Sequence, residues 1–375
     1  MFGKIALTTV LLLALLMLSS GGTQAALVSA TCNNTSTDSA TLQAAINGSA
    51  VADQVQIHGP CLLNATVALK DNRSYVGDGR GATVLKQADG ANLPAMLATD
   101  TWTQNFTSTN LTITVAHLTL DGNKANNATA TTVPLMMRAW DSLLEDLEVE
   151  NAPGDGIRWT NLSQNGTALA GTSVNNTTRD VFIHDTGGAN FHVVDTGNSM
   201  TDFNLQDAWL ADSGTSSDAV DLDNAAGAHL SNLHVYSVGK TAINARRCFS
   251  TRIENNLIEE FGKENLNAAT YFGIRCTVQG DVANTISDNA INHYSALGAQ
   301  STYIYLGIDG VNYSTGHVAV TGNDIYGHSA SAKETGLSYS KGNGAGLKVA
   351  STGNLVDNVG TARVVGAGVT LTAGL

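Results

Sequence analysis

A short apolar motif that recurs along most of the chain is the feature that most restricts the fold. It occurs first as "VAHLTL", ending at Leu120, and last as "STGNLV", ending at Val356, with seven related copies between them. Successive copies are about 23 to 34 residues apart, as in a solenoid whose loops differ in length. One such repeat cannot bury its apolar face alone, so we expect the copies to stack into a single elongated core.

A second short strand follows most copies, after a turn that contains Gly, Asn or Ser, as in "GIRWT", "DAVDLD" and "FGIRCT". Two positions of this strand, two residues apart, stay mostly apolar, so in-register stacking would bury them as two columns. The first column is predicted to hold Met137, Ile157, Phe191, Val220, Ile243, Ile274, Ile308 and Leu337. The second is predicted to hold Ala139, Trp159, Val193, Leu222, Ala245, Cys276, Gly310 and Tyr339.

Asparagine recurs at one turn position of the later copies, where a column of Asn can hydrogen-bond along a stack; the residues are Asn256, Asn289, Asn323 and Asn354. A leucine-rich repeat is the alternative fold, but "LSNLHV" and "VAHLTLDGN" match its Leu-x-x-Leu-x-Leu start only in part. The connecting segments also carry a second strand where that repeat would have a helix. These patterns therefore predict an all-β solenoid of parallel strands.

The repeats resemble the right-handed parallel β-helix of the pectin-lyase-like superfamily over about residues 39–365. The segment "DSATLQAAIN", residues 38–47, predicts a short amphipathic helix, and in this superfamily such a helix caps the first coil. "YVGDGRGATVL", residues 75–85, looks like the Gly-rich early coil that follows it. We expect a single-stranded right-handed parallel β-helix of about nine to eleven coils, in one domain over residues 26–375.

The first 25 residues have the pattern of a secretory signal peptide. Lys4 precedes a mainly apolar run from Ile5 to Leu18, and the small residues Thr23 and Ala25 suit a cleavage site. A membrane anchor is the alternative, but the run is too short to span a bilayer and no polar flank follows to stop transfer. We therefore expect residues 1–25 to be removed and the protein to be secreted.

A net charge of −13 argues against nucleic acid or an anionic membrane as a partner. It also disfavours long-range attraction of acidic polymers. We expect the protein to be a monomer without a membrane span after signal cleavage. About a dozen Asn-x-Ser/Thr sequons are glycosylation candidates in a eukaryotic secretory pathway; they include Asn47, Asn64, Asn105, Asn110, Asn161 and Asn312.

Four cysteines in an exported protein suggest two disulfides. We predict the pairs Cys32–Cys61 and Cys248–Cys276, with buried free thiols as the alternative. No Cys-x-x-Cys pair or His/Cys cluster occurs in the sequence, which argues against a zinc site.

One residue per coil, between the two apolar columns, is expected to face solvent; these residues are Arg138, Arg158, His192, Asp221, Asn244, Arg275, Asp309 and Ser338. Asp223 and Arg246 lie two residues further along the same face. The alternative is a solvated face whose charges keep an exposed sheet soluble. The mixture of Arg, His, Asp and Asn in adjacent coils, without Lys or Glu, favours a functional site.

Proteins of this superfamily mostly act on polysaccharides that lie along the parallel sheet, so the resemblance implies a polysaccharide partner. The first hypothesis is a lyase that cleaves an acidic, uronate-containing polymer by β-elimination, which needs a base and positive charge near the substrate carboxylate. The catalytic candidates are His192, Asp221 and Arg275, and the substrate-binding candidates are Arg158, Asn244 and Arg246. Asp221, Asp223 and Asp195 are candidate Ca²⁺ ligands, because calcium prefers oxygen donors.

Two other functions remain open. Asp221 and Asp223, about 7 Å apart by strand rise, would suit an inverting glycoside hydrolase. A non-catalytic glycan-binding or cell-surface solenoid is the third hypothesis. The pectate-lyase blocks Trp-Ile-Asp-His and Arg-x-Pro-x-x-Arg are absent, and so is the Asp-Pro-His-Glu motif of mannuronan epimerases. The four Trp residues are too scattered for an evident sugar-stacking platform, and we assign Trp159 to the core.

Overall fold

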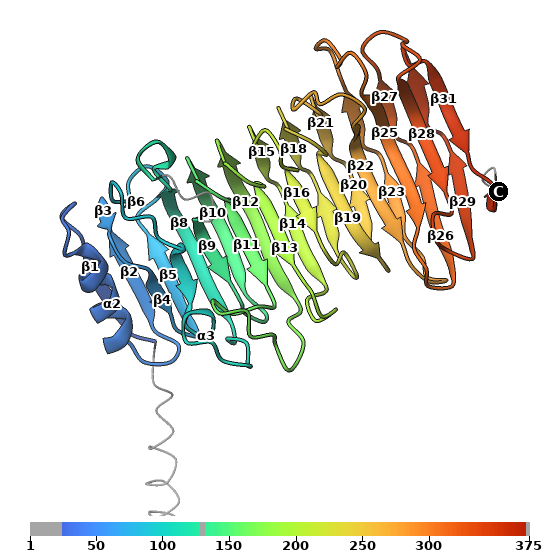
Figure 1. The fold of residues 1–375 in the computed structure, drawn as a ribbon. Coiled ribbons are helices and arrows are strands. Elements are labelled where there is room, and N and C mark those ends of the chain that lie inside the picture. The colour runs from blue at the N-terminus through green and yellow to red at the C-terminus, as the bar shows by residue number, and fades with distance from the viewer. Residues whose placement is uncertain (1–24, 128–131, 373–375) are drawn as a thin grey trace, which may run out of the picture.

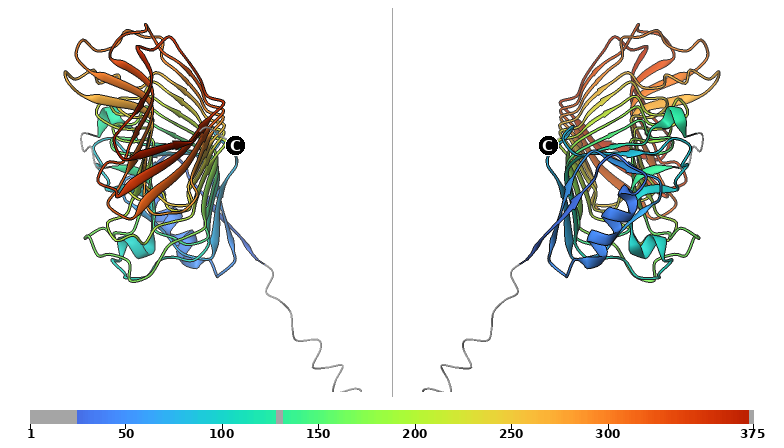
Figure 2. Two further views of the ribbon diagram at one scale, coloured as in Figure 1. Left: turned by 90° about the vertical axis from the view of Figure 1, so that its right-hand side faces the viewer. Right: turned by 90° about the vertical axis from the view of Figure 1, so that its left-hand side faces the viewer.

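The computed structural model describes residues 25–127 and 132–372, and these form one solenoid of stacked coils (Figure 1). All the strand pairings between its named strands are parallel. Seen along its length, the coils superimpose around one elongated core (Figure 2). The predicted parallel β-helix is therefore confirmed, and the predicted signal peptide lies outside the described residues.

One face of the solenoid is a sheet of 11 strands, one from each coil, within the predicted range. Its strands are β4 (Val67–Leu69), β7 (Ala95–Thr99), β9 (Val133–Met137), β11 (Ile157–Thr160), β13 (Phe191–Val194), β16 (Val220–Leu222), β19 (Ile243–Cys248), β22 (Thr270–Val278), β25 (Thr302–Gly310), β28 (Glu334–Ser340) and β31 (Thr361–Val365).

The remaining strands form a sheet of 21 strands that has two ladders before β8 (Ile113–Asp121) and again two ladders after β12 (Asn176–His184). It begins with β1 (Leu27–Thr31), β2 (Gln54–His58), β3 (Cys61–Leu63), β5 (Arg73–Gly77), β6 (Val84–Gln87), β8 (Ile113–Asp121), β10 (Leu143–Glu150) and β12 (Asn176–His184). One ladder continues through β14 (Phe203–Gln206), β17 (His229–Ser231), β20 (Arg252–Glu254), β23 (Thr285–Ser287), β26 (Thr315–Thr321), β29 (Gly346–Thr352) and β32 (Val369–Thr372). The other continues through β15 (Trp209–Ala211), β18 (His234–Tyr236), β21 (Leu257–Glu259), β24 (Ala290–Asn292), β27 (Asp324–Tyr326) and β30 (Leu355–Asp357).

Two buried columns run through the 11-stranded sheet, as predicted, but the register differs in two strands. Ile157 pairs with Leu135, not Met137, and Ile274 pairs with Leu306, not Ile308. Met137 and Ile308 belong to the second column instead, beside Trp159 and Cys276. Each error is two residues, which is one full period of a strand, so the alternation of apolar and polar residues could not reveal it.

The corrected register changes the outward column. Arg158 is adjacent to Met136, and Arg138 is fully buried, where its guanidinium donates to the carbonyls of Thr101, Phe106 and Ser108. Gly307 takes the place beside Arg275 that had been expected for Asp309, which lies one pleat further along, next to Thr277.

The predicted asparagine ladder is present and its side chains are bonded in one direction. The side-chain amide of Asn256 donates to Oδ1 of Asn289 at 2.9 Å, Asn289 donates to Asn323 at 2.8 Å, and Asn323 donates to Asn354 at 2.8 Å. The first three residues are at most 2% exposed. These bonds satisfy amides that would otherwise be costly to bury.

The N-terminal end of the stack is covered by helix α2 (Asp38–Gly48), which matches the predicted cap (Figure 2, right). It buries Leu42 and Ile46 and contacts β1 to β4. Two short helices lie in loops, α3 (Asp100–Thr103) and the 3-10 turn η1 (Lys124–Asn126). No helix within the described residues is long and apolar enough to cross a membrane.

Both predicted disulfides are present. Cys32 and Cys61 have Cα atoms 5.0 Å apart near the capping helix, and Cys248 and Cys276 have Cα atoms 6.2 Å apart in neighbouring coils. Trp159 is fully buried, as expected. Asn110 and Asn161 are also buried, so these two sequons are not accessible to glycosylation in the folded protein.

Candidate functional site

The candidate site lies on the outer face of the 11-stranded sheet, across strands β11, β13, β16, β19 and β22 (Figure 1). The register places five polar residues side by side in consecutive coils: Arg158, His192, Asp221, Asn244 and Arg275. All five were expected in this column from the sequence. Their neighbours along the column are one strand spacing apart, about 4.8 Å.

Two aspartates in the turns before the strands hold this column in place. Asp155 lies three residues before Arg158; its Oδ1 accepts the backbone N–H of Ala189, and its Oδ2 contacts Nδ1 of His192 at 2.7 Å. Asp218 repeats this geometry three residues before Asp221: its Oδ1 accepts the N–H of Thr241, and its Oδ2 accepts from Asn244 at 2.8 Å. Each aspartate thus fixes both the backbone and the outward side chain of the following coil.

Asp155 is a buried carboxylate that pairs with both Arg158 and His192. Arg158 approaches its Oδ2 with Nε at 2.7 Å and Nη2 at 2.6 Å. Burial opposes ionisation of Asp155, but the hydrogen bond with His192 and the charge of Arg158 outweigh burial and lower its pKa to about 2. Burial likewise opposes protonation of His192, and the bond and charge of Asp155 overcome it and raise the pKa of His192. Asp155 is therefore an anion that makes His192 a stronger base.

Asp221 faces His192 from the next coil. Its Oδ2 is 3.7 Å from Nε2 of His192, and its Oδ1 is 2.7 Å from Nη2 of Arg246. The same Nη2 contacts Oδ1 of Asp223 at 2.6 Å. Burial raises the pKa of Asp221 despite the nearby charges of His192 and Arg246. His192 is thus a stronger base and Asp221 a weaker acid than usual, and the two side chains are close enough to contact the same substrate group.

A cavity of about 490 Å³ opens beside these residues, and three arginines and two aspartates line it. The arginines are Arg246, Arg247 and Arg275, and the aspartates are Asp195 and Asp223. Arg275 is 41% exposed; its Nε is 3.3 Å from Oδ2 of Asp309, and its guanidinium lies over the ring of Phe272. In a chain with a net charge of −13, three arginines against two aspartates give this cavity a local excess of positive charge.

Two further hollows lie near this cavity. A larger hollow of about 800 Å³ shares Thr196 and Arg247 with it and is also lined by Phe249 and Tyr313. Near the Arg158 end of the column, a smaller one is lined by Trp102, Arg158, residues 162–164 and Gly166, among others. An extended ligand lying across the coils would therefore meet the smaller hollow and then the 490 Å³ cavity.

The three aspartates expected to bind calcium do not fit that ion. Asp195 is 1% exposed, and its carboxylate accepts hydrogen bonds from the backbone of Gly197, Ser199 and Met200 and from the side chain of Asn224. These donors occupy the lone pairs that calcium would need. Arg246 already lies between Asp221 and Asp223. We therefore do not assign these three carboxylates as calcium ligands.

The sequence reasoning missed Asp155, Asp218 and Arg247 as site residues. A signal for the two aspartates was present, because "DGIR" and "DAVD" both place Asp three residues before an outward polar position. Arg247 follows the last regular outward position of β19, at a bulge, so the strand alternation does not predict its direction.

No family model matches this chain, and no curated protein matches it. Solved structures do match. The A-module of mannuronan C-5 epimerase AlgE4 of Azotobacter vinelandii superposes with a TM-score of 0.60 at 16% identity, over 91% of this chain and 97% of that one. The tailspike protein of E. coli bacteriophage HK620, in complex with a pentasaccharide, gives 0.56 at 12% identity, over 92% of this chain and 64% of that one.

The surface adhesin PfbA of Streptococcus pneumoniae also matches, with a TM-score of 0.52 at 12% identity, over 91% of this chain and 93% of that one. An epimerase, a tailspike and an adhesin thus share this architecture, and at such low identity the likeness shows the fold alone. The chain is a parallel β-helix protein.

Proposed function

We propose that this protein is a secreted enzyme that cleaves an acidic, uronate-containing polysaccharide by β-elimination. The observation that carries the proposal is the cationic cavity lined by Arg246, Arg247 and Arg275, next to the Asp155–His192 pair. Guanidinium groups suit carboxylates, which they can bind through two parallel hydrogen bonds. A polysaccharide in this groove is also consistent with the similar tailspike, which was solved with a pentasaccharide.

The chemistry needs one group to remove the proton α to the uronate carboxylate and another to protonate the leaving oxygen as the glycosidic bond breaks and a double bond forms. His192 is the base: with Nδ1 held by Asp155, its Nε2 can accept the proton, and Asp155 stabilises the resulting imidazolium. Asp221, whose pKa is raised by burial, is the acid for the leaving oxygen. The arginines stabilise the charge that develops on the carboxylate.

Hydrolysis by inversion receives less support from the geometry. Oδ1 of Asp221 and Oδ1 of Asp223 both contact Nη2 of Arg246, so they cannot be further apart than the sum of those distances, about 5.3 Å. An inverting pair needs about 6.5 to 9.5 Å to admit a water molecule.

The test is to incubate the protein with a panel of uronate-containing and neutral polysaccharides, with Ca²⁺ and then with EDTA. We expect ultraviolet absorbance from new double bonds on a uronate polymer. New reducing ends without absorbance would identify a hydrolase, and binding without any product would identify a glycan-binding solenoid. Either result would refute the lyase proposal.

Site assignment is tested with Asp221→Asn, which removes the charge and keeps the shape. We expect activity to fall by about 10²-fold or more, the usual contribution of general acid catalysis, with an unchanged melting temperature. Glu254→Gln is the matched control, because Glu254 is also an outward carboxylate paired with a histidine, His229, but on the other sheet. If Asp221→Asn retains activity within about twofold of wild type, the assignment is wrong.

A further inference from the structure

A second group of functional side chains lies away from the candidate site, on the 21-stranded sheet. Glu148 and Glu150 are in β10, and His184 is opposite Glu150 in the next coil, on β12. Nε2 of His184 is 3.5 Å from Oε1 of Glu148 and 3.9 Å from Oε2 of Glu150. One donor atom from each residue lies within 4.8 Å of the others. Two carboxylates and an imidazole therefore converge on one point.

The imidazole is oriented toward this point by a further carboxylate. Nδ1 of His184 is 2.8 Å from Oδ2 of Asp185, which fixes the Nδ1 proton in that hydrogen bond. Nε2 is buried and has no hydrogen-bond partner. In the neutral imidazole its lone pair faces two carboxylates, an unfavourable arrangement unless a cation lies between them. A carboxylate behind the histidine is the usual arrangement around metal-binding imidazoles.

Neighbouring side chains also orient Glu148 and the ring of His184. The hydroxyl of Thr119 donates to Oε2 of Glu148 at 3.0 Å, which leaves Oε1 directed at His184. The ring of Phe182 stacks on the imidazole, with centroids 4.1 Å apart and planes inclined by 22°. Asp121 is opposite Glu150 on the neighbouring strand β8, so three carboxylates gather around one imidazole and the cluster has an excess of negative charge. A bound cation would relieve that excess.

We propose that Glu148, Glu150 and His184 bind a divalent transition-metal ion of the Zn²⁺ type. One imidazole and two carboxylates are a borderline donor set, which suits Zn²⁺ and similar ions, whereas Ca²⁺ takes oxygen ligands alone. Since the ligands come from β10 and β12, the ion would cross-link two coils. This site could not be found from a sequence motif, because its histidine and its carboxylates are on different coils.

The test uses the full-length secreted protein without a histidine tag, treated with EDTA and titrated calorimetrically with ZnCl₂. We expect one Zn²⁺ per chain, a raised melting temperature with excess Zn²⁺, and no comparable effect of CaCl₂. Titration with Co²⁺ should give a visible absorption band that reports Co²⁺ bound at the site. His184→Asn and Glu150→Gln should each weaken Zn²⁺ binding at least tenfold, and His184→Asn should abolish the Co²⁺ band.

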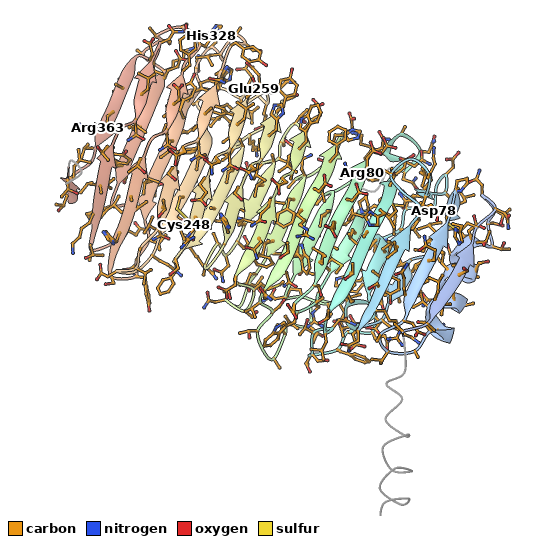
Figure 3. The ribbon with its side chains drawn as sticks, turned by 180° about the vertical axis from the view of Figure 1, so that it is seen from behind. Asp78, Arg80, Cys248, Glu259, His328 and Arg363 are labelled. Carbon is orange, nitrogen blue, oxygen red and sulfur yellow. A yellow bond between two sulfur atoms is a disulfide. The ribbon has the colours of Figure 1, made fainter. Side chains whose placement is uncertain are left out.

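The matched control is His234→Asn. His234 is an outward histidine of β18 on the same sheet, but its Nε2 is already paired with one carboxylate, Glu259, at 2.8 Å (Glu259 is labelled in Figure 3). We expect this variant to bind Zn²⁺ like wild type. The proposal is refuted if wild type binds no stoichiometric Zn²⁺, or if folded His184→Asn and Glu150→Gln variants bind it as tightly as wild type. Neither result would bear on lyase activity, which uses the other sheet.

Discussion

Replacing Asp155 with Asn should remove a charge contribution to folding stability. Replacing Asp218, which has the equivalent position before its strand, should not. Asp155 accepts from Arg158 and His192, and its pKa is lowered to about 2 from 3.8. At about 1.36 kcal/mol per pKa unit, this shift is equivalent to roughly 2 kcal/mol of folding free energy. Asp155 is 6% exposed, so solvent screens little of that contribution. Burial raises the pKa of Asp218 instead, so its ionised form contributes no such stability.

The direction of each pKa shift determines how the free energy of unfolding changes with pH. Because the pKa of Asp155 is lower in the folded protein, its contribution is complete above the unfolded value of 3.8 and is lost as the pH falls toward 2. The pKa of His192 is raised, so its contribution is complete below 6.5 and is lost as the pH rises through its folded value. At pH 6 both groups are charged, and the difference between wild type and Asp155→Asn is therefore expected to be largest near that pH.

The assay is urea unfolding followed by circular dichroism at pH 6 and pH 3. We expect Asp155→Asn to lower the free energy of unfolding by about 2 kcal/mol at pH 6 and by about half as much at pH 3. Asp218→Asn should leave it unchanged or raise it at pH 6. Equal losses at both pH values would mean that packing, not charge, accounts for the effect. An equal loss in both variants would refute the reasoning from their opposite pKa shifts.

Three further predictions follow from the same contacts. If His192 is the base, kcat/KM should rise with pH through a midpoint above 6.5, because its pKa is raised, and Asp155→Asn should move that midpoint down; a pH-independent rate would exclude His192. Asn289→Ala leaves buried amide groups of the ladder unpaired and should cost roughly 3 kcal/mol in urea unfolding, whereas a loss below about 1 kcal/mol would mean that the ladder contributes little. Removing the Cys248–Cys276 disulfide with a double Ala variant should cost about 3.6 kcal/mol from its separation of 28 residues, and an unchanged melting temperature would contradict this.

The sequence was sufficient to predict the fold because most coils repeat the same in-and-out pattern and four of the later coils repeat the same turn asparagine. It predicted which coils lie side by side from β11 to β22, and hence the column from Arg158 to Arg275. It failed at β9, where five consecutive residues are buried, so alternation does not show which of them face the core. It also failed at β25, where a shift of two residues preserves the alternation. Arg138 was misplaced for the first reason.

The contacts within the site were harder to predict than its members. Salt bridges depend on turn residues such as Asp155, whose side-chain direction depends on loop conformation and not on strand alternation. The same applies to Asp195, which was expected to bind calcium but whose carboxylate turns back to bond the backbone of its own loop.

The one-way asparagine ladder restricts how such a chain can change in length during evolution. Its members are separated by 33, 34 and 31 residues, so the loops between them have already varied without disturbing the amide-to-amide bonds. An insertion that moves one asparagine out of its turn would break a bond on each side, whereas an insertion confined to a loop would break none. A duplicated whole coil would carry its own asparagine and extend the series. Viable length variants should therefore gain or lose loop residues or entire coils, and seldom part of a strand.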